Sequence, residues 1–102
     1  MSTRIDSLKG ILEQDPKNSR IRHMLANEYA NAGRYEDAVG VYSTLVDDDP
    51  DYVPGYFQAG RLAEQEGRIE DARAWLERGM AAAARTGDNH ALSEIQAALD
   101  LL

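Results

Sequence analysis

The stretch GRYEDA at residues 33–38 returns as GRIEDA at residues 67–72, 34 positions later in the chain. A second landmark, Asp15-Pro16, returns as Asp49-Pro50 at the same offset of 34. Two independent landmarks that share one period indicate an internal repeat. Together with the helical spacing of the apolar residues described next, this repeat predicts an all-α protein.

The apolar residues follow helical spacing throughout the chain. Ile21, Leu25 and Tyr29 recur at steps of four residues, and Tyr42 and Leu45 continue a similar series later on. No segment alternates apolar and polar residues for long enough to indicate a β-strand. The expected helices span residues 4–14, 19–32, 36–48, 53–66, 69–86 and 89–101.

Glycine marks the places where one helix has to end and the chain has to reverse. Gly33 and Gly67 open the two copies of the repeated motif. Glycine accepts the left-handed conformation that ends many helices, so both positions are expected to be turns. Gly87 is expected to end the fifth helix in the same way, with Asp88 or Asn89 capping the sixth.

The landmark residues of both units resemble those of the tetratricopeptide repeat (TPR) family. The matching residues are Leu25, Ala26, Tyr29, Ala38, Tyr42 and Pro50 in the first unit, and Tyr56, Ala59, Gly60, Ala63, Ala72 and Leu76 in the second. Arg22 departs from the family's aromatic residue, and Ala84 departs from its proline. The resemblance, to a small bacterial-type member, implies a right-handed α-solenoid of antiparallel helix pairs with about six helices.

The chain has 102 residues, which is enough for one modest core, so we expect a single domain. The repeat divides this domain into an N-terminal capping half repeat at 1–18, a first TPR at 19–52, a second TPR at 53–86 and a C-terminal capping helix at 87–102. Each terminal segment is apolar on one side only, which predicts closed ends and a monomer.

Composition narrows the classes of function. The net charge of −7 repels nucleic acid and anionic membrane surfaces, so neither is expected as a partner. The chain has no cysteine, which excludes disulfides, thiolate metal ligands and thiol nucleophiles. No apolar run is long enough to span a membrane, and the first residues do not form a secretory leader, so a cytoplasmic location is expected.

The stretch VDDDPDYV at residues 46–53 places Asp47, Asp49 and Asp51 at the spacing that opens a calcium loop. Such a loop needs glycine at its sixth position and glutamate at its twelfth, and these positions hold Tyr52 and Gln58. The stretch therefore predicts a turn, with Asp51 starting or capping the next turn.

Other catalytic and metal-binding patterns are weak. His23 and His90 are far apart in sequence and are interpreted as surface residues. No nucleophile elbow or phosphate loop is present, so we expect no catalysis and no cofactor. Trp75 is expected to be a packed side chain rather than a partner anchor, and Arg73 is expected to pair with Glu77 on a solvated helix face.

The resemblance implies a non-catalytic module that holds a peptide or helix of another protein in a concave groove. The family's groove positions correspond to Arg20, His23, Asn27, Ala30, Asn31, Phe57, Gln58, Arg61, Glu64 and Gln65. Phe57 offers an apolar platform, and Arg61 offers a guanidinium suited to a carboxylate. Three alternatives stay open: solvated helix faces without a binding role, a self-associating structural subunit, and a small-molecule-binding or accessory subunit of an enzyme.

One specialised function of the family is not expected. Chaperone-binding members hold a peptide carboxylate with five residues, of which His23, Asn27 and Gln58 stand for three here. The remaining two, Lys and Arg, would have to come from the third groove helix, which is the last expected helix of this chain. It offers Asp88 and Leu92, or His90 and Glu94 in a shifted register.

Overall fold

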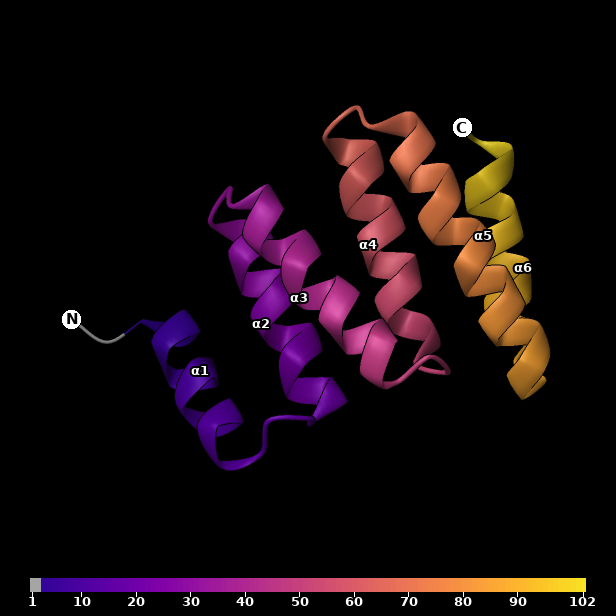
Figure 1. Ribbon diagram of the computed structural model, residues 1–102. Helices are drawn as coiled ribbons and strands as arrows, with labels where there is room; N and C mark the ends of the chain where they lie inside the picture. Colours follow the sequence, from indigo (N-terminus) through magenta and orange to yellow (C-terminus); the bar gives the residue numbers. More distant parts are fainter. Residues whose placement is uncertain (1–2) are drawn as a thin grey trace. The chain divides into compact units, whose positions relative to one another are not determined.

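The computed structural model describes residues 3–102. Within this range the chain forms six α-helices and no β-strand (Figure 1). They are α1 (Arg4–Gln14), α2 (Ser19–Asn31), α3 (Tyr35–Asp48), α4 (Val53–Gln65), α5 (Ile69–Thr86) and α6 (Asn89–Asp100). All six predicted helices are confirmed, each to within one residue at either end. The predicted capping segment 1–18 begins with residues 1–2, which lie outside the described range.

The helices form two compact units, residues 1–49 with α1 to α3 and residues 50–102 with α4 to α6. In the first unit α2 packs against α1 and α3, and in the second α5 packs against α4 and α6. Successive helices within each unit run in opposite directions (Figure 1). A single domain over 1–102, its four segments and its superhelical arrangement stay predictions.

The repeated motif encodes the same turn twice. Gly33 and Gly67 both have a φ of +76°, which is the left-handed conformation. After each glycine, the next amide donates to the carbonyl four positions before that glycine, at 2.9 Å in both turns. The acidic pairs Glu36-Asp37 and Glu70-Asp71 then lie in the first turns of α3 and α5, where carboxylates interact favourably with the helix dipole. The motif therefore ends one helix and starts the next.

Close helix packing in the second unit depends on small residues. A Cβ placed on Gly60 would lie 2.8 Å from two side-chain atoms of Leu76, and a Cβ on Gly79 would lie 2.9 Å from Cβ of Tyr56. Leu76 and Tyr56 are 2% and 4% exposed. Real Cβ atoms do not approach other carbons so closely, so α4 and α5 can pack at this distance only because both positions are glycine.

The aspartate-rich stretch is a turn, as predicted, and the carboxylates of Asp48, Asp49 and Asp51 each have a partner within their own unit. Asp48 ends α3 and accepts from Nη1 of Arg22 at 2.7 Å, while Asp49 accepts from the hydroxyl of Ser19 at 2.6 Å. Asp51 lies in the turn before α4 but does not cap that helix. Tyr52 is the N-cap of α4, and Asp51 instead pairs with Arg85 at 2.9 Å. The described residues contain no group of three or more His, Asp or Glu side chains placed to hold a metal ion.

The two terminal helices cover their neighbours to different degrees. Leu8 of α1 and Ile95 of α6 are buried, whereas Ile11 is 46% exposed and Leu101 is 82% exposed. The apolar face predicted for α1 is therefore only partly covered at Ile11. Gly87 ends α5 with a φ of +71°, and the Asp88 side chain caps α6, both as predicted. No helix in residues 3–102 is both long and apolar enough to cross a membrane.

Candidate functional site

The predicted groove residues of the first unit lie along one face of α2. Arg20, Asn27 and Asn31 are exposed, and His23 and Ala30 are partly exposed. Their spacing of three and four residues places them on a common side of the helix. The structure therefore offers a polar strip on α2 that a partner segment could contact.

Tyr42 of α3 contacts two residues of this strip, Asn27 and His23. Its side chain is 1% exposed, and its hydroxyl donates to Oδ1 of Asn27 at 2.6 Å. The ring of His23 meets the ring of Tyr42 edge-on, with 5.9 Å between centroids. Because the side-chain oxygen of Asn27 already accepts a hydrogen bond, Asn27 can offer N–H donors to a peptide backbone.

The interpretation of His23 as a surface residue is wrong. His23 is half-buried, and its Nε2 is hidden from solvent. Burial lowers the pKa of His23 below its ordinary value of 6.5, so the imidazole is neutral near pH 7. The neighbour that buries one side of the ring, Tyr42, comes from another helix, which local sequence spacing does not reveal. His90 is a surface residue, as predicted, with its side chain 87% exposed.

The predicted residues of the second unit lie along one face of α4. Phe57 and Gln58 are partly exposed, and Arg61, Glu64 and Gln65 are exposed. The guanidinium of Arg61 lies 5.7 Å from the centroid of the Phe57 ring, within the range of a cation–π contact. Phe57 and Arg61 therefore form one composite surface of an aromatic ring and a cation.

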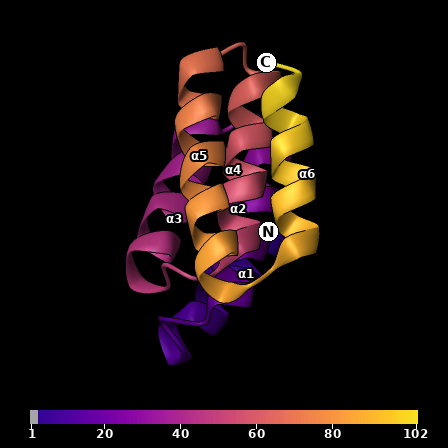
Figure 2. The ribbon, with the colours of Figure 1, turned by 90° about the vertical axis from the view of Figure 1, so that its right-hand side faces the viewer.

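A hollow of about 180 Å³, here called the α4–α6 hollow, joins part of this face to the last helix. Figure 2 shows α6 beside α4 within this unit. Its lining consists of Val53, Pro54, Phe57, Gln58, Asp88, His90, Ala91, Glu94 and Ile95. Val53 and Ile95 are buried at 6% and 1%, so the hollow has an apolar floor. Of the five predicted residues on α4, only Phe57 and Gln58 line it.

Asp88, which caps α6, and His90 and Glu94 of α6 form the rim of the α4–α6 hollow. Asp88 uses one side-chain oxygen to cap α6 by accepting from the amide of Ala91 at 3.0 Å. Nε2 of His90 lies 3.1 Å from Oε1 of Glu94. The sequence predicts a cap at Asp88 and a surface position for His90, but no shared lining with Gln58. That they line one hollow with Gln58 is a result of the tertiary structure.

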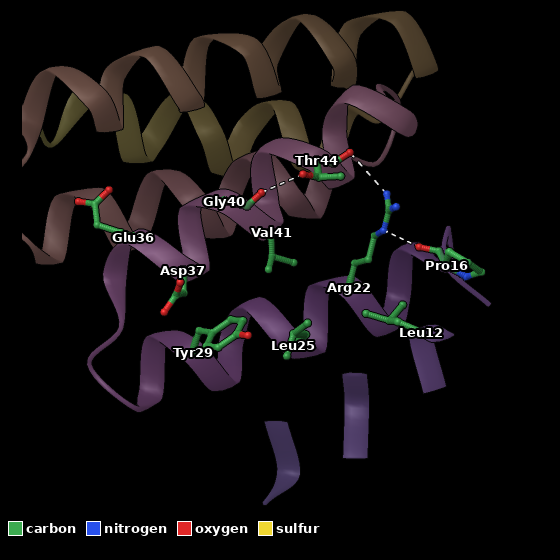
Figure 3. Close-up of a pocket in the computed structure, with 10 residues that line it drawn as sticks. All are labelled: Leu12, Pro16, Arg22, Leu25, Tyr29, Glu36, Asp37, Gly40, Val41 and Thr44. Carbon is green, nitrogen blue, oxygen red and sulfur yellow. Dashed lines mark hydrogen bonds between the residues drawn. The ribbon is translucent and has the colours of Figure 1, made fainter. Parts of the chain in front are cut away.

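A second hollow of about 420 Å³, here called the α1–α3 hollow, lies within the first unit and was not predicted (Figure 3). Its lining consists of Leu12, Pro16, Arg22, Leu25, Tyr29, Glu36, Asp37, Gly40, Val41 and Thr44. Leu25 and Val41 lie near its middle, and Glu36 and Asp37 lie toward one end. Because three helices and one loop contribute, no single stretch of sequence carries its signal.

Arg22, where the family has an aromatic residue, takes over a hydrogen bond that Tyr56 makes in the second unit. Nε of Arg22 donates to the carbonyl of Pro16 at 2.9 Å, and the hydroxyl of Tyr56 donates to the carbonyl of Pro50 at 2.8 Å. Arg22 also pairs with Asp48, and this hydrogen bond lowers the pKa of the Asp48 carboxyl below its ordinary range. Although Arg22 differs from the family's aromatic residue, it still holds the loop before α2 by a hydrogen bond to a backbone carbonyl.

Two further sequence predictions have clear outcomes. Trp75 is packed, as predicted: it is 8% exposed, and its ring lies 6.4 Å from that of Tyr56. The expected pairing of Arg73 with Glu77 is wrong, because Nε of Arg73 lies 3.6 Å from Oε2 of Glu70 instead. Both spacings put a carboxylate next to Arg73 on the helix surface, and the sequence alone does not choose between them.

Known proteins share this arrangement of helix pairs with a 34-residue period. The sequence pattern of the tetratricopeptide repeat matches residues 5–59 and 32–99. The chain belongs to the tetratricopeptide repeat family. A TPR repeat-containing protein of Pseudomonas aeruginosa is 32% identical to it over 91 residues, which cover 89% of this chain and 87% of that protein.

Solved structures show the same fold. The solution structure of a tetratricopeptide repeat domain protein from Salinibacter ruber aligns with a TM-score of 0.76 and 33% identity, covering 82% of this chain and 85% of that one. The solution structure of protein BPP2914 from Bordetella parapertussis aligns with a TM-score of 0.80 and 28% identity, covering 98% of this chain and 87% of that one. TPR domains generally mediate protein–protein interactions and are generally non-catalytic.

Proposed function

We propose that this TPR protein is a non-catalytic scaffold that holds a peptide or helix of another protein, with the exposed face of α4 in the second unit as its main contact surface. The observation that carries this proposal is the α4–α6 hollow. There, Phe57 and Gln58 border an apolar floor formed by Val53 and Ile95. A hollow with an aromatic wall and a polar rim suits the insertion of one side chain from a bound segment.

The size of the hollow favours a peptide over a metabolite. Its volume of about 180 Å³ is below the roughly 300–1,000 Å³ that is usual for small-molecule pockets. A partner segment would place one side chain there and run its backbone along the polar residues of the same face of α4, which are Arg61, Glu64 and Gln65. Within the first unit, Asn27 on α2 offers amide donors of its own.

The test uses ligands selected from random sequences, so that it does not depend on the identity of the partner. A random peptide library displayed on phage is selected on the wild-type protein, and the affinities of enriched peptides are then measured by fluorescence anisotropy. Replacing Phe57 and Arg61 together by Ala should weaken binding by about 2 kcal/mol or more, because an aromatic anchor and its stacked guanidinium are lost.

Ile69→Ala is the matched control, because Ile69 is a 39% exposed apolar side chain on α5 outside the hollow. It should leave affinity unchanged, and helical circular dichroism should be intact in both variants. Equal affinity of the Phe57/Arg61 double variant and the wild type would contradict the proposed site.

The proposal includes a monomeric state. The net charge of −7 adds repulsion between copies, which favours single molecules at physiological salt. Light scattering at tens of micromolar should give a mass near 11.3 kDa. A stable dimer under these conditions would support the self-associating alternative, with the 82% exposed Leu101 as the first residue to test.

A further inference from the structure

The α1–α3 hollow lies on the side of α2 opposite to the proposed groove. The residues of α2 that line the hollow are Arg22, Leu25 and Tyr29. With about 100° of rotation per residue, the centre of this set lies roughly 170–200° around the helix axis from the groove strip that contains Asn27. This position separates the hollow from the function proposed above. We propose that it is a second docking site, which receives a partner segment that presents an aromatic side chain beside an arginine.

The second repeat indicates which side chains such a surface accommodates. At the offset of 34, Gly40, Val41 and Thr44 of the hollow correspond to Ala74, Trp75 and Arg78. The guanidinium of Arg78 lies 5.1 Å from the Trp75 ring and 5.3 Å from the Tyr56 ring. An indole and a guanidinium therefore cover this face of the second repeat, whereas the first repeat has small residues at the same positions. The missing groups define the proposed occupant.

Gly40 has no packing reason to be glycine. It lies within α3, and a Cβ built on it would have no atom within 4 Å. Glycine is less favourable than alanine inside a helix, and the second repeat has alanine at the equivalent position, Ala74. By contrast, Gly60 and Gly79 are needed for close packing. The absence of a side chain at Gly40 keeps the wall of the hollow low, so that a ligand can approach the α3 backbone.

The charges around the hollow favour a cationic group. Glu36 and Asp37 lie toward one end (Figure 3), and Asp37 also accepts from Arg34 at 2.7 Å. Arg22 at the other end pairs with Asp48 at 2.7 Å, as Asp37 pairs with Arg34, so the lining keeps an excess of one acidic side chain. The arginine of the partner would meet the carboxylate end, and its aromatic ring would lie on the apolar centre formed by Leu25 and Val41.

A second copy of this chain is a competing occupant. Its Phe57–Arg61 pair on α4 is itself an aromatic ring beside an arginine, with 5.7 Å between the guanidinium and the ring centroid. The net charge of −7 on each copy opposes such self-docking. We therefore assign the site to another protein and make self-association an outcome of the test.

The experiment uses the full chain and the same phage-displayed peptide library. Enriched peptides are measured against Gly40→Leu, which places a side chain in the hollow without meeting a neighbour at Cβ. Gly10→Leu is the matched control, because a Cβ on Gly10 also has no atom within 4 Å, and Gly10 does not line the hollow. We expect peptides that contain an aromatic residue beside Arg and lose at least about tenfold in affinity on Gly40→Leu only.

The charge requirement has its own pair of variants. Glu36→Gln should weaken these peptides severalfold and reduce the effect of added salt on their binding, because one carboxylate facing the cation is removed. Glu13→Gln, an exposed acid on α1 that does not line the hollow, should change neither quantity. Equal effects of the two substitutions would overturn the assignment of the carboxylate end.

The outcomes separate this inference from the proposed function. Peptides lost on the Phe57/Arg61 double variant but retained on Gly40→Leu would overturn the inference and leave the groove intact. Peptides with the reverse behaviour would support the inference alone. Gly40-sensitive peptides without an aromatic–arginine pair would overturn the proposed occupant. A dimer of the wild type in light scattering that is lost in both Gly40→Leu and the Phe57/Arg61 double variant would also overturn the proposed occupant.

Discussion

The two helix pairs, α2–α3 and α4–α5, share their turns but fill their interiors differently. Both turns have a glycine at φ +76° and both loops have an anchored proline carbonyl, held by Arg22 in one and by Tyr56 in the other. The buried positions then diverge. Tyr42 stands in the first repeat where Leu76 stands in the second, each 1–2% exposed. Repeat landmarks therefore fix backbone geometry, while each repeat packs its own set of side chains.

This difference changes which side chains the helices pack against and what their surfaces leave open. The second repeat packs two glycines, Gly60 and Gly79, directly against side chains of the facing helices. The first has Ala26 and Leu45 at the equivalent positions, together with a hollow of about 420 Å³ beside α3. Tight packing in one repeat and an open hollow in the other make different, measurable predictions.

The largest effect is expected from Leu76→Ala. Leu76 is 2% exposed and packs on the glycine surface of α4, so truncation should leave a cavity and lower the free energy of unfolding by about 3 kcal/mol. Tyr42→Phe at the equivalent position should lower it by only about 1 kcal/mol, because it removes one hydrogen bond to the exposed Asn27. Urea unfolding followed by circular dichroism measures both, and equal losses would contradict the comparison.

Gly60→Ala should be the next most damaging change. The new Cβ would lie 2.8 Å from Cγ of Leu76, so the helices have to shift, at an expected loss of about 2 kcal/mol in unfolding free energy. Combining it with Leu76→Ala should produce less than the sum of the two losses, because the second change removes the clash. Additive losses in urea unfolding would show that Gly60 acts through something other than this contact.

Gly40→Ala in the first repeat should have the opposite sign. No atom lies within 4 Å of the new Cβ, so the substitution should raise the unfolding free energy by up to about 1 kcal/mol through helix propensity. Gly10→Ala in α1 should behave alike for the same reason. A loss of stability at Gly40 but not at Gly10 would mean that the hollow is already closed by packing in the free protein.

The smallest expected effect is a pH dependence of the unfolding free energy caused by His23 in the first unit. Burial lowers the pKa of His23 below 6.5 in the folded chain, so the unfolded chain binds more protons as the pH falls through 6.5. Stability should therefore decrease between about pH 7.5 and 5.5, and His23→Gln should reduce this decrease. His90→Gln, at a side chain that is 87% exposed, is the control. Identical pH profiles for the wild type and His23→Gln would contradict the burial argument.

Much of this protein could be predicted from local sequence. The spacing of Ile21, Leu25 and Tyr29 indicates a helix, and the glycine of each repeated motif marks its end, because both signals depend only on neighbours along the chain. The same holds for the cap at Asp88 and for the turn around Pro50. The groove residues on α2 and α4 follow from family positions, and their binding role stays a prediction.

Tertiary structure decided which side chains meet between helices. It placed Tyr42 against His23 and Asn27, paired Arg22 with the loop carbonyl of Pro16, and brought Asp88 and Phe57 into the lining of one hollow. Distances of this kind depend on how closely two helices pack. That in turn depends on single residues such as Gly60, whose missing Cβ matters only because Leu76 lies opposite. The 34-residue period determined the chain's turns and helices, and the packing of particular side chains determined where its surface is hollow.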